Sequence, residues 1–300
     1  MVLAPKTVRV PASSANLGPG FDTLGLALEI YLTCRFRPSQ ELRITASGLD
    51  SDAVPLDESN LIWQTAVGVA EDQGKTMPPL AIEAANEIPI GKGLGSSASA
   101  LVAGVAIANE ALDLGWDAHR LLDEAARIEG HPDNVAAAVL GSMTTAAIGA
   151  DGVTRAVRVE IPDSFSIAVV TPNFELPTRE MRTVLPECYS KEDTVFNLQR
   201  ATLLVAALAT GTKDVFPEAL ADRMHQPFRA AQVPGMEAIL KLRAPGLLGC
   251  ALSGAGPSIL VFFETGSEHV VDLVSEEFDR AGQETEVRFP SIDREGLRLT

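Results

Sequence analysis

The stretch Pro89–Ala100, which reads PIGKGLGSSASA, constrains the fold more than any other part of the chain. Glycines alternate through it at Gly91, Gly93 and Gly95, and an alanine-rich apolar run follows directly. Glycine lets the backbone turn so that its N–H groups approach a ligand. The apolar spacing over 96–112 predicts a long helix, and the free amides at a helix start carry partial positive charge. The stretch therefore predicts a loop and a helix N-terminus suited to phosphate.

The spacing of the glycines excludes two common phosphate motifs. A Walker A loop requires GxxxxGK followed directly by Ser or Thr, whereas Lys92 lies between two glycines and the serines follow only after Gly95. The dinucleotide fingerprint GxGxxG also fails, and no ribose-binding acid stands at the expected distance. Two interpretations remain. The hydroxyls of Ser96 or Ser97 cap the helix or bind Mg²⁺ while Lys92 offsets negative charge, or the stretch is an ordinary glycine turn with a serine N-cap.

The overall charge limits the kinds of partner that the chain can bind. The formal net charge is -16 at pH 7, and no run of lysine or arginine interrupts it. Such a field repels nucleic acid and anionic lipid, so we expect neither as a partner. The same field repels a polyphosphate. A nucleotide site in this chain therefore needs local backbone dipoles and a divalent cation.

Cysteine usage and apolar segments predict a soluble, cytoplasmic protein. Cys34, Cys188 and Cys250 are widely spaced, with no CxxC pair, so neither a disulfide framework nor a zinc site follows. The first residues, MVLAPKTVRVPASS, lack the apolar core of a signal peptide. The uncharged stretch Ala244–Phe263 contains two prolines and four glycines, which favours strand, turn and strand over a membrane span.

Hydrophobic periodicity predicts a mixed α+β fold. We expect strands at 7–11, 24–36, 42–48, 80–88, 154–162, 165–173 and 284–290, two more about a glycine turn in 246–264, and a loop at 12–22. We expect helices at 60–74, 96–112, 118–129, 134–140, 193–210, 235–242 and 268–281. At 300 residues the chain is long enough for two domains. Its pattern changes near residue 160, so we place the domains at 1–160 and 161–300.

Three further turn-rich stretches share the character of the glycine loop. They are PASSANLGPGFD (11–22), EGHPDN (129–134) and SGAGPS (253–258), each beside a strong apolar segment. In this order, together with GLGSSASA, they resemble the sequence signatures of the GHMP kinases, and ANLGPGFD with HPDN is similar to the homoserine kinase branch. The resemblance spans the whole chain. It implies an N-terminal ATP-binding domain like ribosomal protein S5 domain 2, a ferredoxin-like C-terminal domain, and an active site between them.

The resemblance also implies the cofactors and the residues that bind them. ATP is the phosphoryl donor, and Asn60 lies near its adenine. The residues expected around the phosphates are Pro89, Gly91, Lys92, Gly93, Leu94, Gly95, Ser96, Ser97 and Ser99. Ser97 and Glu129 are expected to hold Mg²⁺. Together these groups supply the local counter-charge that the acidic chain requires.

Homoserine is a zwitterion with one alcohol, so its pocket needs acceptors for an ammonium, a fork for a carboxylate and a polar contact for the hydroxyl. The resemblance places these groups at Asn16, Asp22, His131, Asp133, Arg182, Arg229 and Gly254. The two arginines, in TREMR and HQPFR, are expected to clamp the carboxylate. We interpret His119, His225 and His269 as structural histidines.

Phosphoryl transfer requires mainly alignment and charge neutralisation. Related kinases carry an aspartate and a basic residue for the acceptor hydroxyl, but the matching position here is Asn134, and 11–22 contains no lysine. Because an amide cannot accept the proton, we expect catalysis by positioning, with the proton leaving to the phosphate or to water. Thr178 is expected to orient the hydroxyl, and Glu129 completes the catalytic set.

The activity implied by the resemblance is ATP-dependent phosphorylation of L-homoserine to O-phospho-L-homoserine in threonine biosynthesis, by a homodimer. A kinase for another small alcohol, such as mevalonate or shikimate, is an alternative. A non-catalytic binding protein on the same fold is a further one. The retention of Ser97, Glu129, Gly93 and Gly95 argues against this last interpretation.

Overall fold

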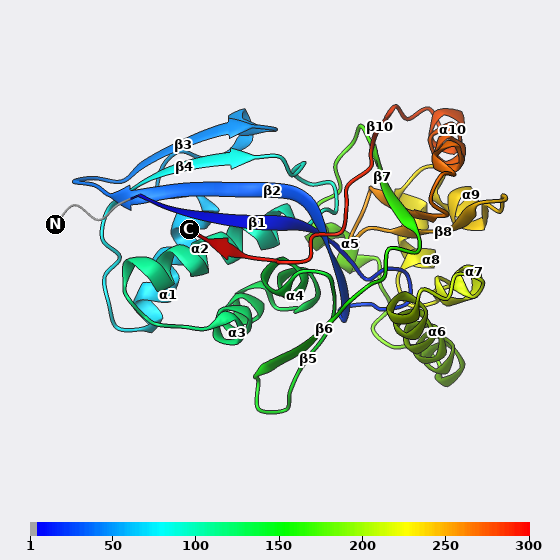
Figure 1. The fold of residues 1–300 in the computed structure, drawn as a ribbon, viewed down its shortest axis with the longest axis horizontal. Helices are drawn as coiled ribbons and strands as arrows, with labels where there is room; N and C mark the ends of the chain where they lie inside the picture. Colours follow the sequence, from blue (N-terminus) through cyan, green and yellow to red (C-terminus); the bar gives the residue numbers. More distant parts are fainter. Residues whose placement is uncertain (1–4) are drawn as a thin grey trace.

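The computed structural model describes residues 5–300, except for the side chains of residues 178 and 179. It contains two β-sheets that lie at opposite ends of the molecule, each with its own set of helices (Figure 1). This arrangement confirms the α+β prediction. Within the described residues, no helix combines the length and apolarity needed to cross a bilayer.

The first sheet has seven strands. They are β1 (Lys6–Ala15), β2 (Leu24–Pro38), β3 (Arg43–Gly48), β4 (Leu80–Asn86), β5 (Met143–Ile148), β6 (Thr154–Val159) and β11 (Arg298–Leu299). The order is β11-β1-β2-β4-β3, and β5 joins β2 to β6. All pairs are antiparallel except β3 with β4. β5 was not predicted, because the small and polar residues of MTTAAI carry little strand signal.

The predicted loop at 12–22 is wrong in its first part. Ala12–Ala15 continue β1 and pair with Gly25–Leu28 of β2, after a register shift between Pro11 and Ala12. Small residues such as these have weak strand propensity, and tertiary pairing overrides it. The true loop is 16–23. It has positive φ at Asn16 and Asp22, a conformation that asparagine and aspartate adopt more readily than most residues.

Four helices cover one face of the first sheet, and Figure 1 shows them beneath β1–β4. They are α1 (Leu61–Asp72), α2 (Ser96–Ala111), α3 (Ala118–Glu129) and α4 (Asp133–Leu140), and a single 3₁₀ turn, η1 (Ser51–Ala53), precedes them. These bounds confirm the predicted helices to within two residues. α2 is almost wholly buried because alanine and glycine let its neighbours approach closely. A Cβ at Gly104 would lie 2.6 Å from the carbonyl oxygen of Ile62 in α1.

The second sheet has four strands in the order β10-β7-β9-β8, all antiparallel. They are β7 (Ser166–Pro172), β8 (Leu247–Leu252), β9 (Ile259–Phe263) and β10 (Thr285–Arg288). The long helix α6 (Lys191–Thr210) connects β7 to β8, and α10 (Asp272–Arg280) connects β9 to β10. This succession and strand order are those of a ferredoxin-like fold.

Short helices fill the connections of the second half. They are α5 (Thr178–Thr183), α7 (Phe216–Ala219), α8 (Gln226–Arg229), η2 (Ala230–Gln232), α9 (Met236–Lys241) and η3 (Glu268–Val271). Only α9 and η3 fall inside predicted helices. Pieces of four to six residues, such as α5, α7 and α8, are too short for a hydrophobic period to reveal.

The chain end returns to the first sheet. Arg298–Leu299 pair with β1, and Ile292 forms a bridge with Leu28 of β2. The buried carboxylate of Asp293 accepts a hydrogen bond of 2.8 Å from the Tyr31 hydroxyl, which anchors this segment. The predicted division at residue 160 falls between β6 and β7 and stays a prediction, but the last residues pack with the first sheet.

One apolar core links the two sheets. It extends from the strands and helices of the first half to Leu204 of α6, Phe216 of α7 and Phe262 of β9. A second core, which includes Met236 and Phe278, packs α9 and α10 against the second sheet. Because the first core is continuous, the loops from both sheets are held in a fixed relation where they meet.

Candidate active site

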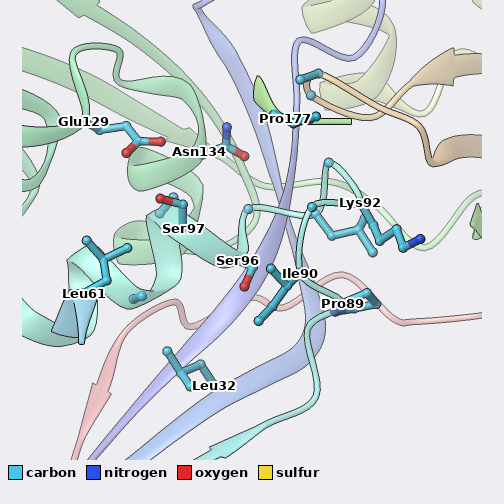
Figure 2. Close-up of a pocket in the computed structure, with 18 of the residues that line it drawn as sticks. Leu32, Leu61, Pro89, Ile90, Lys92, Ser96, Ser97, Glu129, Asn134 and Pro177 are labelled. Atoms are coloured by element: carbon cyan, nitrogen blue, oxygen red, sulfur yellow. The ribbon is translucent and has the colours of Figure 1, made fainter. Parts of the chain in front are cut away.

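One cavity of ≈ 330 Å³ lies where these loops meet. Every predicted site residue whose side chain the structure describes lines it, except Ser99. The side chain of Thr178 lies outside the described part of the chain, so its role stays a prediction. Figure 2 shows Glu129, Asn134 and Ser97 to the upper left of the glycine loop, and Leu61, Ile90 and Leu32 lower in the same view.

The glycine loop has the backbone that its sequence predicts. Gly91, Gly93 and Gly95 have φ values of 70°, 76° and 71°, in the left-handed region that favours glycine. Side chains would also collide there: a Cβ at Gly93 would lie 2.3 Å from the Ser253 carbonyl oxygen, and one at Gly95 would lie 2.2 Å from the hydroxyl of Ser13. The loop therefore packs directly on Ser13 of β1, within PASSANLGPGFD, and on SGAGPS.

The carbonyl groups of the loop are all turned into the protein. Those of residues 91, 92, 93 and 94 accept hydrogen bonds from Leu176 N, Ser258 N, Ser253 Oγ and Ser13 N respectively. No described residue accepts a hydrogen bond from the backbone amides of residues 91–98. A row of free amides beside a helix N-terminus is an anion-binding surface.

The start of α2 rules out the serine N-cap. The N-cap residue is Gly95, and no side chain caps the helix. Ser96 and Ser97 are its first two residues, so neither hydroxyl is engaged as a cap. Both line the cavity.

Two residues predicted to contact the phosphates form hydrogen bonds elsewhere, and only for Ser99 does this exclude its hydroxyl from the cavity. Ser99 is fully buried, and its hydroxyl donates a hydrogen bond of 3.0 Å to the carbonyl of Pro11, which fastens α2 to β1. The ammonium of Lys92 donates to the carbonyls of Pro172 (3.3 Å) and Phe174 (2.8 Å). Figure 2 shows it pointing away from Ser97 and Glu129, so it ties the loop to the second half of the chain, and its contact with phosphate stays a prediction.

An apolar wall closes one end of the cavity. Its side chains are Leu32, Ala46, Ala53, Val54, Pro55, Leu61, Ile62, Ala84 and Ile90. Asn60 shapes this end: its Oδ1 caps α1 by accepting from Ile62 N at 3.0 Å, and its Nδ2 donates to the Pro55 carbonyl at 2.7 Å. The sequence did not reveal the wall, because its apolar residues are spread over strands, a helix and loops and have the pattern of core residues. Its chemistry suits a flat, apolar ring.

Glu129 and Ser97 offer the oxygen atoms that a divalent cation prefers. Glu129 ends α3, and its carboxylate lies on the same side of the loop as the Ser97 hydroxyl (Figure 2). Burial raises the pKa of Glu129, and the positive charge of His131, whose Nε2 lies 3.8 Å away, only partly opposes this effect. A poorly compensated carboxylate beside a hydroxyl fits Mg²⁺, which takes hard oxygen ligands.

Asn134 is held in one orientation by a residue that the sequence did not single out. The buried hydroxyl of Ser13 donates a hydrogen bond of 2.9 Å to Asn134 Oδ1. This contact leaves Nδ2 as the group that Asn134 offers to the cavity. Asn134 therefore acts there as a hydrogen-bond donor. Ser13 lies in PASSANLGPGFD, so the motif pointed to the region but not to this contact.

The half-buried His131 and the buried Asp133 form a pair beside Glu129. The distance from His131 Nδ1 to Asp133 Oδ1 is 2.7 Å, and the same oxygen accepts a bond of 2.8 Å from Asn134 N. Burial lowers the pKa of His131, but the hydrogen bond to Asp133 and the charges of Asp133 and Glu129 outweigh it, so the pKa is raised. The imidazole is thus biased toward its charged form.

Asp22 and Arg182 face each other in the polar end of the cavity. Arg182 donates two hydrogen bonds to Asp22, of 2.7 Å and 3.1 Å. Asn16 positions this loop, because its Oδ1 accepts from Asp22 N and its Nδ2 donates to the Gly254 carbonyl, both at 3.0 Å. An anionic and a cationic receptor group therefore stand side by side.

Arg229 is a buried cation whose hydrogen-bond partners are all neutral. It is 2% exposed and donates to the carbonyls of Met181 (3.2 Å) and Gly254 (3.0 Å) and to His225 Nδ1 (3.2 Å). Burial, with the nearby charge of Arg182, lowers the pKa of Arg229 to about 10, so it remains charged at neutral pH. A buried guanidinium that lines a cavity in this way suits an incoming carboxylate.

Comparison with known proteins agrees with this geometry. Residues 60–142 match the profile of the GHMP kinases N terminal domain, and residues 204–280 match that of GHMP kinases C terminal. The fold and the glycine-loop site thus define a kinase of the GHMP class.

Individual relatives narrow the class. The homoserine kinase of Solibacter usitatus is 63% identical over 98% of this chain and 96% of its own length. The homoserine kinase of Deinococcus radiodurans is 46% identical over 87% of this chain and 85% of its own length. The crystal structure of homoserine kinase from Cytophaga hutchinsonii has a TM-score of 0.86, covers 100% of this chain and 99% of its own, and is 26% identical. The chain belongs to the homoserine kinase family.

Proposed function

We propose that the protein transfers the terminal phosphoryl group of ATP to the side-chain hydroxyl of L-homoserine, giving ADP and O-phospho-L-homoserine on the route to threonine. The observation that carries the proposal is the composition of one cavity. It joins an apolar end and a row of free amides to a polar end that holds both an anionic and a cationic receptor group. A zwitterionic alcohol needs both charges, whereas mevalonate needs no anionic group and a sugar needs neither.

The nucleotide end binds by backbone rather than by side-chain charge. The amides of 91–98 and the N-terminus of α2 would receive the triphosphate, and the apolar wall would receive the adenine. Ser97 and Glu129 would hold Mg²⁺, which neutralises phosphate charge when it is bound. The amides and the cation would supply the local positive charge that a nucleotide site needs in a chain of formal charge -16.

The substrate end matches the three polar groups of homoserine. Asp22 would accept hydrogen bonds from the ammonium, while Arg229 and Arg182 would bind the carboxylate. Asn16, His131, Asp133 and Gly254 complete the wall of this pocket. Asp22 and Arg182 pair with each other in the structure. On binding, the substrate ammonium would replace Arg182 as the partner of Asp22, and the substrate carboxylate would replace Asp22 as the partner of Arg182.

The chemical step would proceed by alignment. The homoserine oxygen attacks the terminal phosphorus, and the bond from that phosphorus to the bridging oxygen of ADP breaks. Asn134 presents Nδ2 and so can donate to an oxygen but cannot take the hydroxyl proton. The proton would leave to the transferred phosphate or to water. Thr178 keeps its proposed role in orienting the hydroxyl.

An ADP-release assay tests the proposal. Purified protein with Mg-ATP is presented with L-homoserine, mevalonate, shikimate and galactose, and we expect L-homoserine to give the highest kcat/KM. Arg182→Met and Arg229→Met should each raise the homoserine KM. Arg155→Met, at an exposed arginine paired with Asp151 on the β5–β6 hairpin, is the matched control. Preference for another alcohol, or unchanged kinetics in both pocket variants, would exclude the assignment.

A cytoplasmic location and a homodimer are further proposals. They rest on composition and on the family resemblance. Light scattering after size-exclusion chromatography should give about twice the chain mass of 31.7 kDa. A monomeric mass at assay concentration would exclude the dimer, and cell fractionation tests the location.

A further inference from the structure

Arg229 is supported from behind by His225, the N-cap residue of the short helix α8 that Arg229 ends. His225 is fully buried and does not line the cavity. Its Nδ1 lies 3.2 Å from Arg229 Nη1, and its Nε2 lies 2.6 Å from the carbonyl oxygen of Gly18. The imidazole thus connects the loop after β1 to the guanidinium that we expect to bind the substrate carboxylate.

The two partners fix the protonation of this imidazole. The Gly18 carbonyl can only accept, so Nε2 must carry the hydrogen. Guanidinium can only donate, so Nδ1 must offer its lone pair. His225 is therefore neutral, with its hydrogen on Nε2. Burial also lowers the pKa of His225, in agreement with this assignment.

Neighbouring groups hold the imidazole ring in place. Phe21 stacks on it with ring centroids 5.4 Å apart and an interplanar angle of 25°. The guanidinium groups of Arg229 and Arg182 lie 5.5 Å and 5.7 Å from the centre of the same phenyl ring. One aromatic side chain, next to Asp22 in the sequence, thus contacts the histidine and both arginines.

The charged groups that face His225 are Asp222, Arg229 and, farther away, Asp22. Asp222 Oδ2 lies 3.6 Å from His225 Nε2. Its carboxylate already accepts hydrogen bonds from the backbone amides of residues 224, 225 and 226 and from Asn197. It therefore fixes the turn that begins α8, and the Gly18 carbonyl remains the close acceptor for Nε2.

We propose that His225 is a positioning residue for homoserine: the neutral imidazole orients Arg229 so that Nη2, the guanidinium nitrogen not bound to His225, Gly254 or Met181, meets the substrate carboxylate. This inference rests on the proposed function and adds to it a residue that never touches substrate. It concerns only the amino-acid end of the cavity. The structure describes no hydrogen bond between His225 and the loop that would bind ATP.

The test compares His225→Leu with His225→Gln in steady-state kinetics. Leucine leaves the Gly18 carbonyl and Arg229 Nη1 without their partner, so we expect the homoserine KM to rise about 10-fold or more, while the ATP KM changes by less than about twofold. Glutamine offers both an acceptor and a donor, so it should bring the homoserine KM back to within about threefold of wild type.

Phe278→Leu is the control for a general loss of packing, because Phe278 is fully buried in the core between α10 and the second sheet. It should lower the unfolding temperature and leave both KM values unchanged. Should His225→Leu not fold, His225→Asn, which is too short to reach both partners, takes its place.

Three results would overturn the inference: an unchanged homoserine KM in His225→Leu, an equal rise of both KM values, or a His225→Gln enzyme no better than His225→Leu. Turnover by the wild-type protein distinguishes the role of His225 from the proposed function. A wild-type protein that does not phosphorylate homoserine would refute the proposed function and not the role of His225. In that case a crystal structure of His225→Leu still decides the inference. Arg229 should have left the Gly254 carbonyl, and an unmoved Arg229 would refute it.

Discussion

The replacement Gly93→Ala tests whether the shape of the glycine loop is what binds ATP. Gly93 has a φ of 76°, and a Cβ there would lie 2.3 Å from the Ser253 carbonyl oxygen and 2.8 Å from that of Gly256. Both obstacles are backbone atoms, so they cannot swing away as a flexible side chain would. The loop must therefore move, and its free amides must move with it.

The expected free-energy cost of Gly93→Ala has two parts. Holding alanine in the left-handed region costs about 1–2 kcal/mol, and forcing a methyl group into a packed contact costs about 1–3 kcal/mol more. Gly74→Ala isolates the first part, because Gly74 has a φ of 64° and nothing within 4 Å of its Cβ position. The second part, if it appears as lost nucleotide affinity, corresponds to a roughly 5- to 150-fold rise in the ATP KM.

Coupled ADP-release kinetics at saturating homoserine measure this effect. We expect Gly93→Ala to raise the ATP KM within that range, and Gly74→Ala to lose stability in urea unfolding with wild-type kinetics. Circular dichroism of both variants should retain the helical signal. A folded Gly93→Ala enzyme with an unchanged ATP KM would refute the reasoning, because the phosphates would then bind away from the displaced amides.

Two further predictions concern the catalytic end of the cavity. Ser13→Ala removes the hydrogen bond that orients Asn134, so kcat should fall about 2- to 10-fold with both KM values nearly constant; an unchanged kcat would contradict this role. Burial raises the pKa of Glu129 above its ordinary value of 4.5, so the folded state binds this proton more tightly than the unfolded state does. The stability that this tighter binding contributes is lost as the pH rises from 4.5 through the raised pKa. Glu129→Gln should therefore unfold at a higher temperature than wild type at pH 7 without Mg²⁺, the difference should vanish near pH 4, and Mg²⁺-dependent ADP release should be lost. A variant less stable than wild type at pH 7 would show that the carboxylate is not strained by burial.

The glycine loop and the long helices were predictable because their signals are local. Alternating glycines indicate positive φ directly, and apolar spacing predicts α2 and α6 without any information about the elements that pack against them. Ala12–Ala15 and β5 were missed for the opposite reason. Their small and polar residues become strands only because β2 pairs with them.

Side-chain direction was the part of the site that the sequence could not supply. Lys92 in the glycine loop and Ser99 in the first turn of α2 are residues of the right chemistry, yet Lys92 binds carbonyls about 80 positions away and Ser99 binds the Pro11 carbonyl. The support that His225 gives Arg229 depends equally on Gly18, which is distant in the chain. Such contacts follow from how the two sheets pack, and no local pattern encodes them.

The central claim is that free main-chain amides at the start of α2 hold the triphosphate of ATP next to a receptor for a zwitterionic alcohol. A crystal structure with Mg²⁺, a non-hydrolysable ATP analogue and L-homoserine tests it most directly. We predict phosphate oxygens within hydrogen-bond distance of the amides in 91–97, and the homoserine carboxylate on Arg229. Phosphates bound elsewhere, or homoserine away from Arg229, would contradict the account.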